Sequence, residues 1–256
     1  MRRRGVGSRS MSVKSKWTKT KWLWSDRVLR RYVPDTMRFT RSSLKEMTGR
    51  YKTVYFKPTG GTGGNGIARV KRLTSRKFQV KKDVSSFEVS SSALFGRLKR
   101  IARGRSYLLQ KGIALETSGG RPFDLRMMMQ KTKAGKWVPS LLFVKLGKPN
   151  KVVTNYHQGG KLAYVEQTLR RTGCSAPQIE RYKKRLKKLG MQTARCFDRR
   201  SKKFKELGLD IALDRKGRLW ILEVNTRPSF SALKSLADKN YYRTIVRYGK
   251  QYGRTR

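Results

Sequence analysis

The amino-acid sequence predicts an α+β fold with antiparallel sheets. Short apolar segments bounded by turn residues follow one another closely between residues 53 and 145 and again between 207 and 224, which is typical of strands joined by hairpins. The segment 175–194 instead repeats apolar residues at helical spacing. We therefore expect hairpin-connected strands together with separate helices, as in α+β proteins.

The start of the chain predicts a tail and then short helices. Residues 1–14 are mostly basic or small, so we expect a disordered basic tail. In Ser15–Tyr32, tryptophans and aliphatic residues alternate with lysines and arginines, which predicts one or two short helices with a buried aromatic face. Stacking of these rings on nucleic acid is the alternative. Ser42–Met47 predicts a capped helix that ends near Gly49.

A glycine-rich loop lies between two predicted strands. The first strand, 53–57, is apolar apart from Lys57, and the second, 67–73, alternates apolar and basic residues and continues in character to residue 80. The glycines of the loop are Gly60, Gly61, Gly63, Gly64 and Gly66. Such a loop exposes backbone N–H groups that can surround phosphate oxygens, and Lys57 adds a positive charge. The period of two after the loop favours a β-loop-β flap over a dinucleotide-binding turn, which requires a helix there. A glycine hairpin without a ligand is the alternative.

The middle of the chain predicts a helix and then more strands. Residues 90–102 place apolar side chains on one helical face. The apolar strand 107–113 ends in a polar hinge, and 123–129 and 137–145 follow as antiparallel strands joined by a turn at 133–136. Three consecutive methionines in the first of these two strands are expected to fill the core.

The last third predicts a long helix, a hairpin and a helix pair. Ser175 is a suitable cap and Pro177 suits the first helical turn. The segments 207–213 and 219–224 flank an Asp-Arg-Lys-Gly turn and predict a hairpin. Residues 231–256, which are rich in tyrosine and arginine, predict a pair of helices.

Three oxygen-bearing side chains of the hairpin predict a metal site. Glu223 and Asn225 point to the same side of one strand, and Asp210 falls nearly opposite Glu223 on the other. Carboxylate and amide oxygens are ligands that magnesium prefers. Ion pairing with basic residues is the alternative for a lone carboxylate, whereas the full set favours a metal. With the phosphate-type loop, these residues predict a nucleotide–magnesium enzyme.

The charge of the chain predicts an anionic partner. It has 64 Lys and Arg against 15 Asp and Glu, a net charge of +49. Repulsion on this scale favours a nearby polyanion, which we expect to be nucleic acid, an acidic polymer or an acidic protein layer. A solvated basic surface is the alternative. With 37% hydrophobic residues, a packed interior is expected rather than disorder.

Several classes of protein are disfavoured. No apolar run approaches the ~20 residues of a membrane span, and the N-terminus lacks the apolar region of a signal peptide, so a cytoplasmic protein is expected. Cys174 and Cys196 belong to no Cys/His cluster, so we expect reduced thiols and no structural zinc. His157 is the single histidine, and nothing near it suggests a catalytic triad.

The order of these motifs resembles the ATP-grasp superfamily, and more narrowly the YheC/YheD branch associated with bacterial endospores. The segments VYFKPTGGTGGNGIARV and LGLDIALDRKGRLWILEVNTRPSF carry most of the resemblance, which covers roughly residues 15–240. It implies an ATP-grasp fold in which two α+β lobes with antiparallel sheets clasp the nucleotide. The divisions expected on this basis are a vestigial N-terminal segment 15–50, a first lobe 51–112, a second lobe 113–240 and a basic C-terminal tail 241–256.

The resemblance also implies roles for individual residues. Lys57 would contact the phosphates of ATP, beneath a flap formed by Gly60–Gly66, and Arg126 would face the γ-phosphate or an acyl phosphate. The residues implied to line the adenine are Gln110, Lys111, Gly112 and Ile113. The residues implied to hold Mg²⁺ are Asp210, Glu223 and Asn225, with Asn155 as a further candidate.

Two functions of different classes follow. The first is an ATP- and magnesium-dependent carboxylate–amine or carboxylate–thiol ligase that forms an acyl phosphate, is spore-associated and acts on unknown carboxylate and amine substrates. The second is a basic polyanion-binding or packaging protein whose nucleotide site is idle or sensory. The set of Lys57, Arg126, Asp210, Glu223 and Asn225 favours the ligase, whereas the charge and the short segment before the flap favour the binding protein.

Overall fold

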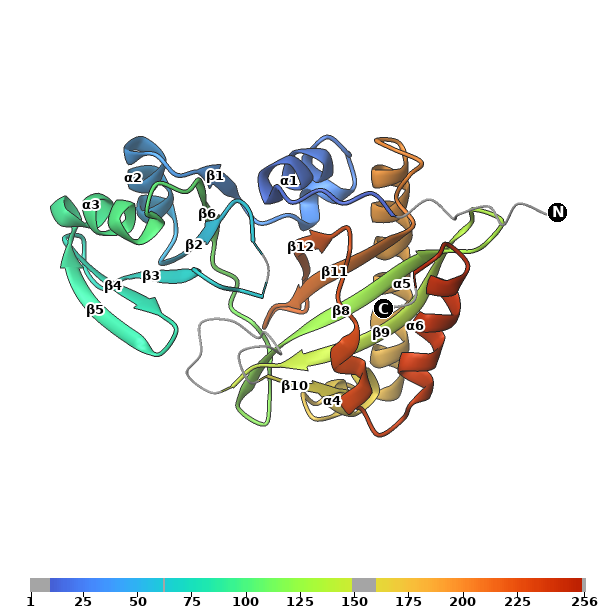
Figure 1. Ribbon diagram of the computed structural model, residues 1–256. Helices are drawn as coiled ribbons and strands as arrows, with labels where there is room; N and C mark the ends of the chain where they lie inside the picture. Colours follow the sequence, from blue (N-terminus) through green and yellow to red (C-terminus); the bar gives the residue numbers. More distant parts are fainter. Residues whose placement is uncertain (1–9, 62, 149–159, 255–256) are drawn as a thin grey trace.

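The computed structural model describes residues 10–61, 63–148 and 160–254. Within these ranges the strands form two six-stranded antiparallel sheets, each at the centre of its own lobe, and the lobes lie side by side (Figure 1). The predicted α+β class is confirmed. No helix in the described ranges has both the length and the apolar character needed to cross a bilayer.

The first lobe is a sheet covered on one face by two helices. The strand order is β1 (Thr36–Arg38), β6 (Tyr107–Lys111), β2 (Thr53–Pro58), β3 (Ala68–Arg72), β4 (Lys77–Lys82) and β5 (Ser85–Ser90). The helices are α2 (Arg41–Arg50) and α3 (Ser91–Ala102), and their Leu44 and Leu98 share a buried core with Phe56. Because side chains alternate along β2, Lys57 points to the opposite face of the sheet.

The second lobe is a sheet with helices on both faces. The strand order is β10 (Lys161–Ala163), β9 (Trp137–Leu146), β8 (Arg121–Lys131), β11 (Glu206–Leu213) and β12 (Leu219–Asn225), with β7 (Thr117–Ser118) beside β8. The helices are α4 (Val165–Arg170), α5 (Ala176–Asp198), η3 (Ser231–Ser235) and α6 (Asn240–Lys250). Met127 and Met129 join the core beneath α5, whereas Met128 joins the one beneath α6. The expected core role of the methionines is thus confirmed, on both faces.

The segment before the flap is divided between the lobes. Its first part, α1 (Lys16–Trp24) and η1 (Leu29–Tyr32), packs on the second lobe, while β1 and α2 belong to the first. The ring of Trp22 meets Phe197 and Phe204 edge to face, at centroid distances of 5.3 and 6.1 Å. Core packing, rather than nucleic-acid stacking, therefore accounts for Trp22.

The sequence-based expectation did not include β1, β7, β10 or α4, and three further features differ from it. The strand β5 was not predicted, because the turn before it uses Asp83, at φ 53°, and Val84 in place of glycine, proline or asparagine. The cap of α2 is Thr40, whose hydroxyl accepts from the Ser43 N–H, rather than Ser42. The expected tail 241–256 contains most of α6, whose Ile245 is fully buried, because that helix covers an apolar face of the second sheet.

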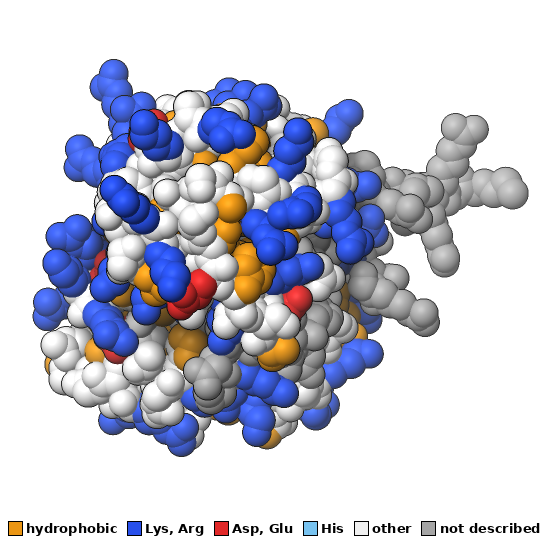
Figure 2. Space-filling model, turned by 90° about the vertical axis from the view of Figure 1, so that its left-hand side faces the viewer, with side chains coloured by type: hydrophobic (Ala, Val, Ile, Leu, Met, Phe, Trp, Pro, Cys, Tyr) orange, Lys and Arg blue, Asp and Glu red, His pale blue; other side chains and the backbone are white. Residues whose placement is uncertain are grey.

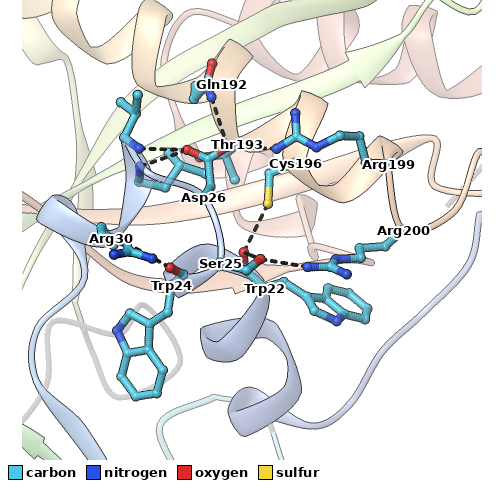
Figure 3. Close-up of polar contacts among 12 residues, drawn as sticks. Trp22, Trp24, Ser25, Asp26, Arg30, Gln192, Thr193, Cys196, Arg199 and Arg200 are labelled. Carbon is cyan, nitrogen blue, oxygen red and sulfur yellow. Dashed lines mark hydrogen bonds and ion pairs between the residues drawn. The ribbon is translucent and has the colours of Figure 1, made fainter.

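A buried carboxylate fixes the N-terminal segment on α5 (Figure 3). Asp26 accepts hydrogen bonds from the N–H groups of Val28 and Leu29, from Gln192 Nε2 at 3.0 Å and from Arg199 Nη2 at 2.7 Å. Burial alone would raise the pKa of Asp26, but these hydrogen bonds outweigh it and hold the pKa below its usual value. The anchor sets where α1 lies above the second lobe.

Replacing this anchor should destabilise the fold. Asp26→Ala leaves the buried Leu29 N–H and three partly buried donors without their acceptor, so we expect the free energy of unfolding at neutral pH to fall by about 2 kcal/mol. Since the pKa of Asp26 is lowered in the folded protein, its contribution is present above the unfolded pKa and disappears as the pH falls through the folded one. Urea denaturation at pH 7 and pH 3 measures both effects. Glu166→Ala, at an exposed i,i+4 pair, is the control and should change little; equal effects of the two variants would contradict the anchor.

Candidate active site

A cleft of about 590 Å³ opens between the lobes. The first lobe contributes the end of β2 and the glycine loop, and the second contributes β8, β9, β11 and β12. The charged side chains that line it are Lys16, Lys57, Arg126, Lys145, Arg227, Asp124, Asp210 and Glu223. Because basic groups outnumber acidic ones, the cleft favours an anionic ligand.

Lys57 lies partly buried on the first-lobe side of the cleft. Its Nζ donates to Gln110 Oε1 at 2.6 Å, and Gln110 Nε2 donates to Thr36 Oγ1 at 3.1 Å. Burial lowers the pKa of Lys57 to about 8, and Glu223 only partly offsets this effect. The lysine therefore holds its proton weakly until a further negative charge arrives.

The glycine loop has the backbone conformation of a flap. Gly61, Gly63, Gly64 and Gly66 all have φ between 74° and 97°, a region that favours glycine, and the first three line the cleft. A Cβ at Gly66 would lie 2.9 Å from Tyr107 Oη, just beneath the flap. Gly60 differs, since its φ is not positive and it does not line the cleft.

The hairpin β11–β12 brings the predicted metal ligands together. Asp210 is paired in register with Glu223 on one side and with Arg126 of β8 on the other. Asn225 Nδ2 lies 3.3 Å from Asp210 Oδ2. The three predicted ligands therefore lie at one end of one hairpin and line the same cleft.

Asp210 is the centre of a buried ion-pair network. Its Oδ1 accepts from Arg126 Nε at 2.6 Å and from Lys145 Nζ at 2.8 Å, and Lys145 also lies 2.9 Å from Asp124. Burial would raise the pKa of Asp210, but the two cations outweigh it and hold the pKa well below its usual range. Burial would likewise lower the pKa of Arg126 and Lys145, but the carboxylates raise both. Asp210, Arg126 and Lys145 are therefore charged at neutral pH.

Sequence reasoning missed Lys16 and Lys145. Lys16, at the start of α1, places Nζ 2.8 Å from Gly61 O and 3.2 Å from Glu223 Oε1, and its backbone N–H donates to Thr59 O. The sequence feature that marks Lys16 is its position directly after the helix cap Ser15. The partners of Lys16 are distant in sequence and could not be inferred. Lys145 had a weaker signal, a lone cation that ends an apolar strand.

The four residues predicted to line the adenine, 110–113, lie in different surroundings. Gln110 lines a cavity of about 20 Å³ between β6 and β12, which has room for a water molecule but not for a nucleobase. Lys111 lies over the rings of Tyr51 and Trp220, at 5.2 and 5.1 Å from their centroids. The large cleft is not lined by Lys111, Gly112 or Ile113. Their contact with adenine stays a prediction, and it requires the lobes to separate. Asn155 and His157 lie outside the described residues.

The chemistry of the hairpin residues fits a hard divalent cation. Asp210, Glu223 and Asn225 supply two carboxylates and an amide oxygen, which are the ligand types of Mg²⁺. The described residues contain no group of three or more His, Cys, Asp and Glu arranged to hold a metal, so the amide and the nucleotide phosphates would have to complete the coordination. Lys16 and Lys145 now neutralise these carboxylates.

Comparison with known proteins agrees with this geometry. Residues 9–255 match the family described as YheC/D like ATP-grasp. The chain is similar to two curated proteins of Bacillus subtilis (strain 168), both described as endospore coat-associated: YheD, 28% identical over 194 residues, and YheC, 26% identical over 217 residues. These alignments cover 73% and 83% of this chain but 42% and 59% of the relatives, so the chain spans about half the length of the proteins it matches.

Solved structures show the same fold at low identity. VanG D-Ala:D-Ser ligase from Enterococcus faecalis has a TM-score of 0.56 and 13% identity, over 91% of this chain and 57% of that one. N5-carboxyaminoimidazole ribonucleotide synthetase from Thermotoga maritima has a TM-score of 0.52 and 13% identity, over 95% and 51%. The fold is therefore ATP-grasp, as the resemblance implied.

The lowered pKa of Lys57 predicts proton uptake when a nucleotide binds. Phosphates raise the pKa of a nearby lysine, so binding above pH 8 should take up a proton, and ATP affinity should fall by up to about tenfold per pH unit. Titration calorimetry at pH 8.5, in two buffers with different ionisation enthalpies, measures the uptake. Lys57→Arg keeps the charge and should abolish the uptake; uptake that persists in this variant would assign the proton elsewhere.

The flap predicts a glycine requirement that depends on position. Gly63→Val/Gly64→Val forces β-branched residues into positive φ, so ATP affinity should fall by about tenfold or more while the second lobe remains folded. Gly60→Ala is the control, because its Cβ meets nothing within 4 Å and its φ is not positive. Calorimetry and thermal melting of both variants test this. Full affinity in the double variant would reduce the loop to a structural hairpin.

Proposed function

The chain belongs to the YheC/D-like ATP-grasp family, and from that premise we propose that it is an ATP- and magnesium-dependent ligase that joins a carboxylate to an amine or a thiol. In this reaction a carboxylate oxygen attacks the γ-phosphorus of ATP and ADP leaves. The amine or thiol then attacks the acyl carbon, and phosphate leaves. The observation that carries the proposal is the convergence of Lys57, the flap and the Asp210 network on one cleft.

The first-lobe residues are suited to holding the polyphosphate. Lys57 and Lys16 supply two positive charges at the flap, and the loop Gly60–Gly66 supplies backbone N–H groups beside them. Charge neutralisation and positioning are the main requirements of phosphoryl transfer. No protein nucleophile or histidine base is needed for this role.

The second-lobe residues are suited to the transferred group and the metal. Arg126 lines the cleft on β8 and can stabilise negative charge that develops on the transferred phosphoryl group or on an acyl phosphate. Asp210, Glu223 and Asn225 would hold Mg²⁺, which when bound neutralises phosphate charge. Fixed donors in a partly buried cleft stabilise such charge more strongly than water does.

Ligand binding requires an exchange of ionic partners. Glu223 is now neutralised by Lys16, and Asp210 by Arg126 and Lys145. A triphosphate brings enough negative charge to attract these cations, and the carboxylates then become available to a divalent cation. This exchange avoids leaving any buried charge without a partner, which would cost several kcal/mol. Metal and nucleotide should therefore bind together rather than separately.

The second candidate is a basic polyanion-binding protein whose nucleotide site is idle or sensory. The net charge of +49 and the closed ion-pair network around Asp210 favour it. Measuring ADP release across panels of carboxylic acids and amines separates the two functions. Acid-dependent ADP release supports the ligase, whereas ATP binding without release for any acid and amine supports the alternative.

We further propose a polyanionic partner, which the excess of basic residues supports. The names of the two Bacillus relatives support an association with endospores, which we propose for this chain as well.

The metal assignment predicts a selective loss in one hairpin variant. Glu223→Gln removes an anionic ligand but keeps size and hydrogen bonding, so magnesium-dependent ATP affinity should fall by about 10- to 100-fold. Glu88→Gln, at an exposed ion pair on the first lobe, is the control and should leave affinity unchanged. Calorimetry with ATP, with and without Mg²⁺, measures the effect. Equal Mg-ATP affinity in the two variants would contradict the assignment.

A further inference from the structure

The outward face of α5 carries a row of basic side chains. Apart from the sequence neighbours Lys184 and Arg185, successive members are three or seven residues apart, so the row keeps to one side of the helix. We call this row the α5 stripe, and it consists of Arg181, Lys184, Arg185, Lys188 and Arg195. All five are exposed. From first to last the stripe extends about 21 Å, at 1.5 Å per residue.

Ion pairing within the protein does not explain the stripe, although Arg185 lies over the ring of Tyr182 and donates to Gly217 O. In the part of the chain that the structure describes, no ion pair includes any of its members; the acids of this helix pair instead with Lys183, Lys131 and Lys202. Lys184 and Lys188, and likewise Arg181 and Arg185, are like charges at i,i+4, which destabilise a helix. These like-charge pairs therefore do not stabilise the helix that carries them.

Basic residues elsewhere are easier to explain. Figure 2 shows lysines and arginines across the whole end of the first lobe, so a positive surface alone singles out nothing. A comparable group at the end of α3, the α3 cluster, consists of Arg97, Lys99, Arg100, Arg103 and Arg105. Lys99 and Arg100 lie in the last turn of the helix and Arg103 is its cap, where the dipole favours cations. Arg97 lies over the ring of Phe87, and Arg105 lies over the ring of Tyr107. The α3 cluster is thus a matched group of five for which the helix end and local ring contacts supply a reason.

The α5 stripe is separate from the nucleotide cleft. The helix covers the face of the second sheet that presents Met127 and Met129, and Gly190 of α5 lies directly against Met129. Arg126 and Asp210, which line the cleft, belong to the opposite face. At the far end of α5, Arg199 and Arg200 turn toward Asp26 and Ser25 and are already engaged (Figure 3). A ligand on the stripe therefore lies a sheet away from ATP.

We propose that the α5 stripe binds the phosphate backbone of a double-helical nucleic acid. The stripe holds five cations on a rigid helix, and a duplex offers a rigid line of closely spaced phosphates. It exposes no aromatic ring for stacking, since Tyr182 is partly buried, which disfavours single strands. The neighbouring Gln178 and Gln192 are engaged in the helix cap and with Asp26, so they are not available to read bases.

An acidic protein partner fits the stripe less well. Protein interfaces have an apolar or aromatic centre with charges at the rim, and the stripe has cations along its whole length. Binding through these contacts should be independent of sequence and strongly dependent on salt, because each neutralised phosphate releases counterions. It should also be independent of ATP, because the sheet separates the two sites.

The test compares two variants with the same change in charge. In one, the five residues of the α5 stripe are replaced by glutamine; in the other, the five of the α3 cluster are. The probe is a fluorescent 24-base-pair DNA duplex, titrated by anisotropy between low and moderate salt, with polyglutamate as competitor. Thermal melting and Mg-ATP calorimetry accompany each variant. Arg181→Gln/Arg185→Gln/Lys188→Gln replaces the five-residue variant should that one not fold.

We expect the stripe variant to lose about tenfold or more in duplex affinity. The slope of log K against log salt should become shallower by about 4.5, or by about 2.7 for the triple variant, at about 0.9 per phosphate contact. The α3 variant should keep the wild-type slope, and ATP affinity should be unchanged in the stripe variant. Equal losses in the two variants would overturn the proposal, because the attraction would then be general. Selective loss of polyglutamate binding alone would overturn it as well, in favour of an acidic polymer. Because ADP release is not measured in this experiment, its outcome does not bear on the ligase proposal.

Discussion

The carboxylate of Asp210 is the contact on which the arrangement of the cleft depends. It accepts from Arg126 and Lys145, which are buried cations of two neighbouring strands, and it lies beside Asn225 of a third. A chain with 64 basic and 15 acidic residues can bury a cation only where one of its few acids lies close by. The position of Asp210 in the sheet register therefore decides which cations face the cleft, and it keeps them charged there.

The same scarcity of acids explains other parts of the structure. Asp26 fixes the N-terminal segment on α5, and that segment in turn carries Lys16 to the flap and to Glu223. Glu206, which is fully buried, pairs with Arg254 and accepts from Tyr252, so it joins the end of the described chain to the second sheet. Each buried acid thus connects two elements that are distant in sequence. No acidic residue of the described chain forms an ion pair with the α5 stripe, and we therefore propose an anionic ligand for it.

Local patterns in the sequence were sufficient for much of the fold and for part of the site. The alternation around Lys57, the turn after Leu213 and the cap at Ser175 each act over a few residues, so strand, hairpin and helix could be predicted from them. The pairing of Asp210 with Glu223 followed from the short turn between their strands. Lys16 and Lys145 could not be found in this way, because their partners come from remote segments. The turn at Asp83 was missed because a non-glycine residue adopts positive φ there.

We propose that nucleotide and metal together separate Asp210 and Glu223 from their lysine and arginine partners. Crystals grown with Mn²⁺ and a non-hydrolysable ATP analogue test it most directly, since the anomalous signal of manganese locates the metal. The account predicts manganese between the phosphates and the oxygens of Asp210, Glu223 and Asn225, with Lys16 and Lys57 turned to the phosphates. Nucleotide bound in the cleft while Asp210 and Glu223 keep their present ion pairs, with manganese elsewhere or absent, would contradict it.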